Sequence, residues 1–302
     1  MTKTELTPKR KMIYADLSLL LVALVWGGGF VVMKGALDNI TPFYIMAVRF
    51  TLATAIMCLI LNKRLRNITK KDLYAGAVIG ILLFLGFSAQ TIGLQYTTAS
   101  KQAFLTGTNV VIVPFLAWMV HKQRPDGYAF SSTFLALIGI GLLTIQGSFF
   151  INKGDLLTLI CAVFFAAHIV SVGYFAKGKD PFLLAFVQMA VAALIFSIFA
   201  LIFEPVPRVF DKQMVSAVAY LVLFPTLMAF VIQNTAQQFT TSTRTALILC
   251  LESVFGTILA VMFLKEMLTI QMIAGCVLIL IAIVLAETKL DFLKNRKRKL
   301  LH

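Results

Sequence analysis

The sequence predicts an all-α polytopic membrane protein whose ten transmembrane helices form two inverted five-helix repeats. Three observations predict this fold. Apolar runs of about 20 residues, the length that crosses a bilayer, recur from one end of the chain to the other. Only 13% of the residues are charged, which is about half the usual share in a soluble domain. A polar phrase in the first half returns, nearly unchanged, in the second half.

The apolar runs follow one another with short connections, so no soluble domain is expected between them. They are long and do not alternate apolar with polar residues, which excludes a transmembrane β-barrel. The expected spans cover residues 16–36, 42–61, 73–95, 99–120, 130–147, 155–176, 181–203, 213–237, 242–264 and 268–287.

The repeated phrase begins at Gln95 with Gln-Tyr-Thr-Thr-Ala-Ser-Lys-Gln-Ala-Phe-Leu. At Gln238 the chain reads Gln-Phe-Thr-Thr-Ser-Thr-Arg-Thr-Ala-Leu-Ile. Each copy is a short polar elbow followed by a long apolar run. Only Gln102 against Thr245 is a marked change, because the other positions are identical or close substitutions.

The repeat extends through both halves of the chain. Asp16 and Asp155 begin spans 1 and 6, and Pro42 and Pro181 begin spans 2 and 7 at the same offset. Because five is odd, the second copy enters the membrane from the opposite side, which is an architecture of secondary transporters. We therefore expect repeats at 16–147 and 155–287, an N-terminal segment at 1–15 and a basic tail at 288–302.

The formal net charge of +14 would suggest a nucleic-acid partner in a soluble protein. Here most of the 27 Lys and Arg residues lie in loops and tails on one side of the expected topology. The positive-inside rule then places both termini in the cytoplasm of a multi-pass protein in the cell (plasma) membrane. The expected partners are the lipid bilayer and a small solute, with no nucleic acid. The four cysteines lie within apolar runs without metal-ligand spacing, so no metal or cofactor is expected.

Several motifs, in their order and spacing, resemble the EamA-type family of the ten-span drug/metabolite transporter superfamily. They are Trp26-Gly27 through Phe30 and Lys34, Arg49-Phe50, the Thr-Thr-Ala-Ser elbow running to Pro114, and Leu251-Glu252-Ser253-Val254-Phe255 leading to Lys265-Glu266 and Gly275. The resemblance implies a monomer or homodimer that moves small metabolites, often outward. It also implies that spans 1, 3, 4, 6, 8 and 9 line a central cavity, with spans 5 and 10 peripheral. Ser253 stands where the family usually has Pro, which predicts a less kinked span 9.

Glu252 lies near the middle of span 9, among apolar neighbours. A charge at the bilayer centre costs at least about 2.5–3.5 kcal/mol, so the carboxyl group must face a cavity or a partner. It is a candidate for binding a substrate amine or a coupling proton, and the structural alternative is a protonated acid that holds two helices together. Asn109 has the equivalent place in span 4 and could supply a hydrogen bond at the same depth.

Four further polar or aromatic residues in the spans complete the candidate path together with Arg49. The guanidinium of Arg49 needs a carboxylate, carbonyl groups or water, unless it reaches the interface as a helix-end side chain. His168 suits a proton relay, or a neutral hydrogen bond between helices. Trp26 could form an aromatic wall or simply pack in the core. The amides of Gln90 and Gln233 suggest a hydrated path for a polar solute, with hydrogen bonds between helices as the alternative.

The function predicted from these features is secondary transport of small polar metabolites, such as amino acids or amines, by alternating access. The alternatives are a channel and an intramembrane enzyme. The sequence holds no His-Glu-x-x-His, no Gly-x-Ser-x-Gly and no pair of intramembrane aspartates, so we do not expect an enzyme. A channel usually carries a filter motif or rings of charge, whereas inverted repeats with sparse charge favour alternating access. The sequence also lacks a Walker A motif, which disfavours ATP-driven pumping.

Overall fold

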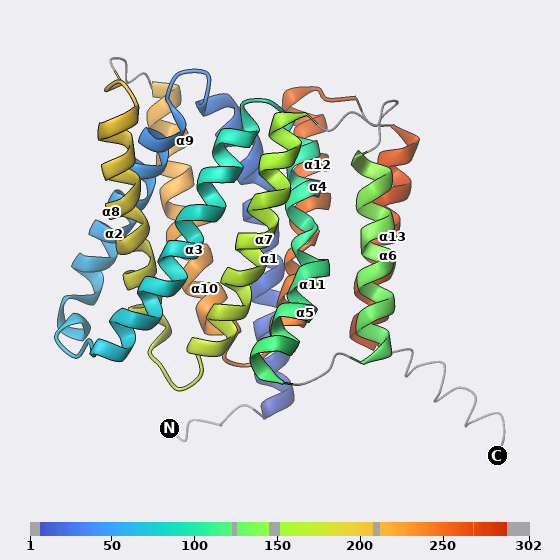
Figure 1. Cartoon of the computed structure of the whole chain (residues 1–302), viewed down its shortest axis with the longest axis horizontal. Helices are drawn as coiled ribbons and strands as arrows, with labels where there is room; N and C mark the ends of the chain where they lie inside the picture. The colour runs from blue at the N-terminus through green and yellow to red at the C-terminus, as the bar shows by residue number, and fades with distance from the viewer. Residues whose placement is uncertain (1–6, 123–125, 145–151, 208–211, 268, 289–302) are drawn as a thin grey trace, which may run out of the picture.

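The computed structural model describes residues 7–122, 126–144, 152–207, 212–267 and 269–288. In this part of the chain every regular element is a helix, and the helices stand side by side in one elongated bundle (Figure 1). They are α1 (Pro8–Ala36), α2 (Pro42–Leu65), α3 (Lys70–Leu94), α4 (Ala99–Gly107), α5 (Asn109–His121), α6 (Gly127–Thr144), α7 (Lys153–Phe175), α8 (Pro181–Phe203), α9 (Lys212–Val222), the π-helix η1 (Leu223–Met228), α10 (Ala229–Ala236), α11 (Ser242–Leu249), α12 (Leu251–Leu264) and α13 (Ile270–Thr288).

These elements correspond to ten crossings, which confirms the fold class. Eight continuous or interrupted helices are long and apolar enough to span a membrane, and shorter apolar stretches lie in α6 and α13. Spans 4, 8 and 9 are each interrupted: α4 is followed by α5, α9 by η1 and α10, and α11 by α12. Helix α1 begins two turns earlier than expected, because Pro8 occupies its first turn and Lys9, Arg10 and Lys11 extend it beyond the apolar run.

The two repeats run in opposite directions. Helix α1 starts at the lower edge of Figure 1 and α7, its counterpart, starts at the upper edge. Similar caps mark the starts of α3 and α7, where the Thr69 and Asn152 side chains each accept from a backbone N–H three residues on. We name the two edges of the bundle after the residues that begin the repeats: the Asp16 end and the Asp155 end.

Helices from different repeats pack closely, and small residues let their backbones approach. A Cβ on Gly27 of α1 would lie 2.7 Å from the backbone nitrogen of Gly256 in α12. A Cβ on Gly80 of α3 would lie 2.7 Å from the carbonyl oxygen of Gln188 in α8. Because lipid supplies no hydrophobic drive between helices, such close contact is a main source of their association.

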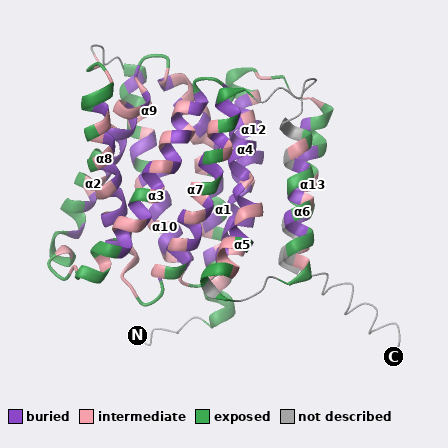
Figure 2. Cartoon of the chain, viewed as in Figure 1, coloured by how far each residue is buried: buried purple, intermediate pink, exposed green. Residues whose placement is uncertain are grey.

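The buried residues gather between the helices, and exposed residues cover the outside and the loops (Figure 2). The outward-facing side chains include large apolar ones such as Leu59, Leu201 and Ile270, as expected of a surface that meets lipid. Helices α6 and α13 form a pair at one side of the bundle (Figure 1). This arrangement leaves the centre to the other spans of the two repeats.

Candidate functional site

A cavity lies at the centre of the bundle, between the two repeats, and holds about 700 Å³ of space including its solvent-open part. Its described lining residues come from α1, α2, α3, α4, α5, α7, η1, α10, α11 and α12. These elements belong to the six spans that the family resemblance implied, with span 2 in addition. Among the described residues, neither α6 nor α13 contributes to the lining.

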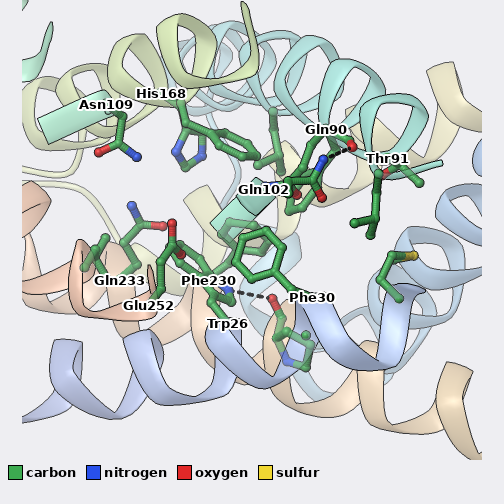
Figure 3. Close-up of a pocket in the computed structure, with 18 of the residues that line it drawn as sticks. Trp26, Phe30, Gln90, Thr91, Gln102, Asn109, His168, Phe230, Gln233 and Glu252 are labelled. Carbon is green, nitrogen blue, oxygen red and sulfur yellow. Dashed lines mark hydrogen bonds between the residues drawn. The ribbon is translucent and has the colours of Figure 1, made fainter. Parts of the chain in front are cut away.

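All the residues proposed from sequence as the path line this cavity: Trp26, Arg49, Gln90, Asn109, His168, Gln233 and Glu252. They are spread over seven spans, so the fold, not the sequence order, brings them together; Figure 3 labels all of them except Arg49. Their roles in binding or coupling stay a prediction.

Glu252 and Asn109 owe their positions to equivalent interruptions of spans 9 and 4. Helix α11 ends at Leu249 and α12 begins at Leu251, and the Ser253 N–H donates three residues back to the Cys250 carbonyl at 3.1 Å. In the first repeat the Thr108 N–H donates in the same way to the Leu105 carbonyl at 3.2 Å, and α5 begins with Asn109. Span 9 is therefore interrupted even though Ser253 replaces the usual Pro. Broken helices at the midplane are a feature of transporter binding sites.

The carboxyl group of Glu252 lies beside the amide of Gln233, with Asn109 and His168 facing them (Figure 3). Glu252 is 6% exposed, and it forms no hydrogen bond or ion pair with the described residues. Asn109 Oδ1 and Gln233 Oε1 are buried and also lack a hydrogen-bond partner within the described chain. Buried oxygens of this kind usually have a donor. This side of the cavity therefore presents acceptors that suit the N–H groups of a ligand.

His168 has a protein partner in the structure. Its Nε2 lies 3.0 Å from Gln188 Oε1 of α8, and its ring meets Phe230 with centroids 5.9 Å apart. The sequence left two roles open for His168, a proton relay and a hydrogen bond between helices. The contact with Gln188 supports the second. The ring still borders the cavity and faces the Glu252 side.

Arg49 reaches the cavity from α2 and is held by the π-helix of span 8. Its Nε donates to Thr226 Oγ1, and its Nη2 donates to the Pro225 carbonyl at 3.2 Å. Its Nη1 contacts the sulfur of Met46 at 3.9 Å, and its guanidinium carbon lies 4.8 Å from the centre of the Phe87 ring. None of the ion pairs among the described residues includes Arg49. A guanidinium has five N–H groups, so the N–H groups without a protein acceptor can serve a ligand.

The π-helix turns the Pro225 carbonyl toward two cavity residues. Thr226 Oγ1 donates to the Leu221 carbonyl at 2.7 Å, and Pro225 itself has no N–H to give to the helix. The Trp26 Nε1 donates to the same Pro225 carbonyl at 2.9 Å (Figure 3). One irregular turn therefore fixes both the aromatic wall and the guanidinium. Such π-segments occur frequently at functional sites.

Aromatic side chains form much of the remaining wall. Trp26 packs against Phe230 with ring centroids 5.7 Å apart, and Phe87 packs against Phe165 at 5.0 Å. These phenylalanines were missed in the sequence, because the chain has 26 of them and nothing marks those that face a cavity.

Polar groups continue the lining from Gln90 toward the Asp155 end. Gln90 Nε2 donates to Thr106 Oγ1 at 3.3 Å, and Gln102 Nε2 donates to the Gln90 carbonyl at 2.6 Å. Gln102 Oε1 is buried without a described partner. Gln102 was also missed as a site residue, although the sequence carries a signal for it. It is the one marked change between the two copies of the repeated phrase.

The model of the EamA-like transporter family matches the chain twice, over residues 13–145 and 152–288. The chain belongs to the EamA-like transporter family. An uncharacterized transporter of Archaeoglobus fulgidus is 37% identical over 279 residues, covering 92% of this chain and 87% of that protein. The uncharacterized transporter YoaV of Bacillus subtilis is 24% identical over 279 residues, covering 89% and 94%.

A solved structure, described as the crystal structure of a protein, has the same fold. Its TM-score is 0.74 with 19% sequence identity, and the match covers 92% of this chain and 97% of the other. EamA membership makes the chain a multi-pass membrane protein and a transporter, and the names of its relatives point to transport and not to an enzyme.

Proposed function

We propose that this EamA-type protein is a secondary transporter that moves small polar metabolites, such as amino acids or amines, by alternating access. The observation that carries the proposal is the central cavity, in which a carboxyl group and some guanidinium N–H groups have no partner among the described residues. In the proposed complex, Glu252 binds an ammonium group of the solute and Arg49 binds a carboxylate. Trp26, Phe87 and Phe230 enclose the apolar part.

The inverted repeats supply the proposed movement. Two copies of one unit in opposite orientations give two related conformations, each open to a different side of the membrane, around one site at their interface. The family matches at 13–145 and 152–288 support repeats close to 16–147 and 155–287. Net flux needs a gradient or a difference in affinity between the two conformations. Exchange of solutes, or antiport with a proton bound at Glu252, would meet that need.

Exchange in proteoliposomes tests the function. Vesicles that hold the purified protein and a mixture of labelled amino acids and amines should release at least one of them, with a rate that saturates and rises when the same unlabelled solute is outside. Saturation reflects a binding site, and stimulation by external solute reflects a site that alternates between sides. Non-saturating flux at channel rates would favour the channel, a chemically altered solute would favour an enzyme, and no flux of any solute would reject the proposal.

The orientation is a separate proposal: both termini lie in the cytoplasm, at the Asp16 end of the bundle. It rests on the basic residues at the end of α2 and the start of α3, and on those in the first turn of α1. The N-terminal residues up to Leu6 and the basic tail from Lys289 lie outside the described residues. A reporter fused after Lys71 should read cytoplasmic, and one fused after Lys153 should read external. The reverse result at either position would contradict this orientation.

A further inference from the structure

We propose that the short half-helices α4 and α11 are the two gates of the transporter, each hinged at the interruption beside the cavity and latched at its far tip by an ion pair to the other repeat. The latches are Lys101–Asp155 at one end and Arg244–Asp16 at the other. The proposal rests on the proposed function, because a gate has a meaning only if the cavity opens in turn to each side.

The latch at the Asp16 end joins α11 of the second repeat to α1 of the first. Arg244 donates through Nε to Asp16 Oδ1 at 3.1 Å and through Nη2 to Asp16 Oδ2 at 2.6 Å. This two-point geometry is the strong form of an arginine–carboxylate pair. Arg244 stands in the first turn of α11, which the Thr241 hydroxyl caps.

The latch at the Asp155 end joins α4 of the first repeat to α7 of the second. Lys101 Nζ lies 2.7 Å from Asp155 Oδ2, and Asp155 is 2% exposed. The Thr97 hydroxyl also donates to Asp155, at 3.1 Å. Lys101 stands in the first turn of α4, which the Thr98 hydroxyl caps. The two latches thus use equivalent residues of the two copies, with the repeats exchanged.

Each half-helix connects its latch directly to the binding cavity. Helix α11 runs from Arg244 in its first turn to Leu249, which lines the cavity, and the next helix begins beside Glu252. Helix α4 likewise runs from Lys101 to the interruption at Thr108, just before Asn109. A change at the tip of either half-helix is therefore transmitted over about two turns to the group that would hold the solute.

Among the described residues, the other two ion pairs between the repeats do not involve a half-helix. Lys179 pairs with Asp72, at the start of α3, at 2.7 Å. Arg64 and Asp180 pair at 3.3 Å between the end of α2 and the start of α8. At the opposite end of the same two helices, both carboxylate oxygens of Glu204 accept from the N–H groups of Phe43 and Tyr44. Helices α2 and α8 are thus tied at both ends and away from any interruption. We expect the interface between α2 and α8 to stay closed while the gates move. Its ion pair is therefore a matched control for the two latches.

The tip of α4 carries one restraint that the sequence does not repeat for α11. Glu266, which follows α12, accepts from the backbone N–H groups of Ala99 and Ser100. At the equivalent place after span 4 the sequence has Gln123, which lies outside the described residues. Lys122 and Lys265, which precede these two positions, share a left-handed backbone with φ of 59° and 56°. The two hydrogen bonds to Glu266 hold the tip of α4 in addition to its latch. We therefore expect the α11 gate to open more readily than the α4 gate.

Sided labelling of the cavity tests the gates without knowledge of the solute. Leu249→Cys, in a chain whose four cysteines are replaced by Ala, is exposed to a membrane-impermeant maleimide from either side of oriented vesicles. Adding Arg244→Gln should raise labelling from the Asp16 side about two- to five-fold, the range expected for losing a partly exposed ion pair. Lys101→Gln should raise labelling from the Asp155 side instead. Arg64→Gln, which breaks the α2–α8 pair, should change neither.

Reversible cross-linking provides the second measurement. A bifunctional thiol reagent that a reductant can cleave, joining Asp16→Cys to Arg244→Cys, should stop solute exchange until the reductant is added. The same reagent joining Arg64→Cys to Asp180→Cys should not. Unchanged sidedness of labelling, or exchange that continues through the cross-linked α11 latch, would overturn the gates. Equal inhibition by the α2–α8 cross-link would do the same. Absence of exchange even in the protein with Asp16 and Arg244 intact would count against the proposed function and leave the labelling result to decide on the gates.

Discussion

Replacing Glu252 by Gln is expected to abolish solute exchange while the protein still folds. The substitution keeps the shape of a side chain that lines the cavity but removes its negative charge. A hydrogen bond to a charged group contributes about 1.5–3 kcal/mol, so affinity for an ammonium group should fall by about 10- to 150-fold. If the carboxyl group instead carries the coupling proton, net flux driven by a pH gradient disappears. Exchange in proteoliposomes measures the first effect and pH-driven uptake the second.

A carboxylate outside the cavity supplies the matched control for Glu252. Glu204→Gln makes the same chemical change where the carboxylate caps α2. It should lower the thermal stability of the purified protein, because a negatively charged group at a helix N-terminus is stabilising, but it should leave exchange nearly unchanged. Full exchange together with unchanged pH-driven uptake by Glu252→Gln would instead give that residue a purely structural role between helices.

Replacing Arg49 by Lys is expected to remove the preference for solutes that carry a carboxylate. The change retains the positive charge but loses the planar fork that can bind both carboxylate oxygens at once. It also disturbs the contacts with Thr226, the Pro225 carbonyl and the Phe87 ring, so some loss of stability is expected as well. The readout is therefore a ratio of affinities and not an absolute affinity.

Three related solutes provide that ratio: the amino acid that the transporter exchanges, its carboxamide, and the amine that lacks the carboxyl group. Competition against labelled solute should show the intact protein preferring the acid by about 10-fold or more, the effect of about 1.4 kcal/mol or more. In Arg49→Lys the three solutes should compete almost equally. Arg64→Lys, at an exposed ion pair away from the cavity, should keep the preference. An unchanged preference in Arg49→Lys would assign the carboxylate to other donors.

The spans could be predicted from sequence because a helix that crosses lipid must be apolar for about 20 residues, whatever its neighbours are. The interruptions of spans 4, 8 and 9 could not. They depend on contacts between segments that are distant in the chain, such as the bond from Ser253 Oγ to the Ala103 carbonyl at 2.7 Å. Pro114 also lies within α5 without ending it, so proline alone does not mark where a span breaks.

Most polar residues of the cavity, though not Gln102, could be found for a similar reason. A charged or amide side chain within a span must face a cavity or a polar partner, because lipid cannot solvate it. Arg49 and Glu252 could therefore be identified as candidates from the sequence. The partners of charged residues near the span ends could not be predicted. From the sequence, Lys101 resembles a basic side chain that extends to the interface. Only the fold shows that its Nζ lies 2.7 Å from Asp155 Oδ2. Which phenylalanines face the cavity could not be known either, because lipid-facing and core-facing positions are equally apolar.

The crosswise ion pairs have a consequence for the five-helix unit considered by itself. Each unit carries an aspartate at the start of its first span and a base at the start of its fourth, at opposite edges of the membrane: Asp16 with Lys101, and Asp155 with Arg244. A unit alone therefore leaves both charges unmatched, and two copies in the same orientation would place like charges at the same edge. Two copies in opposite orientations match both at once. The charge pattern of one half thus favours a partner in the opposite orientation. Two halves made as separate polypeptides should therefore associate with opposite orientations in the membrane.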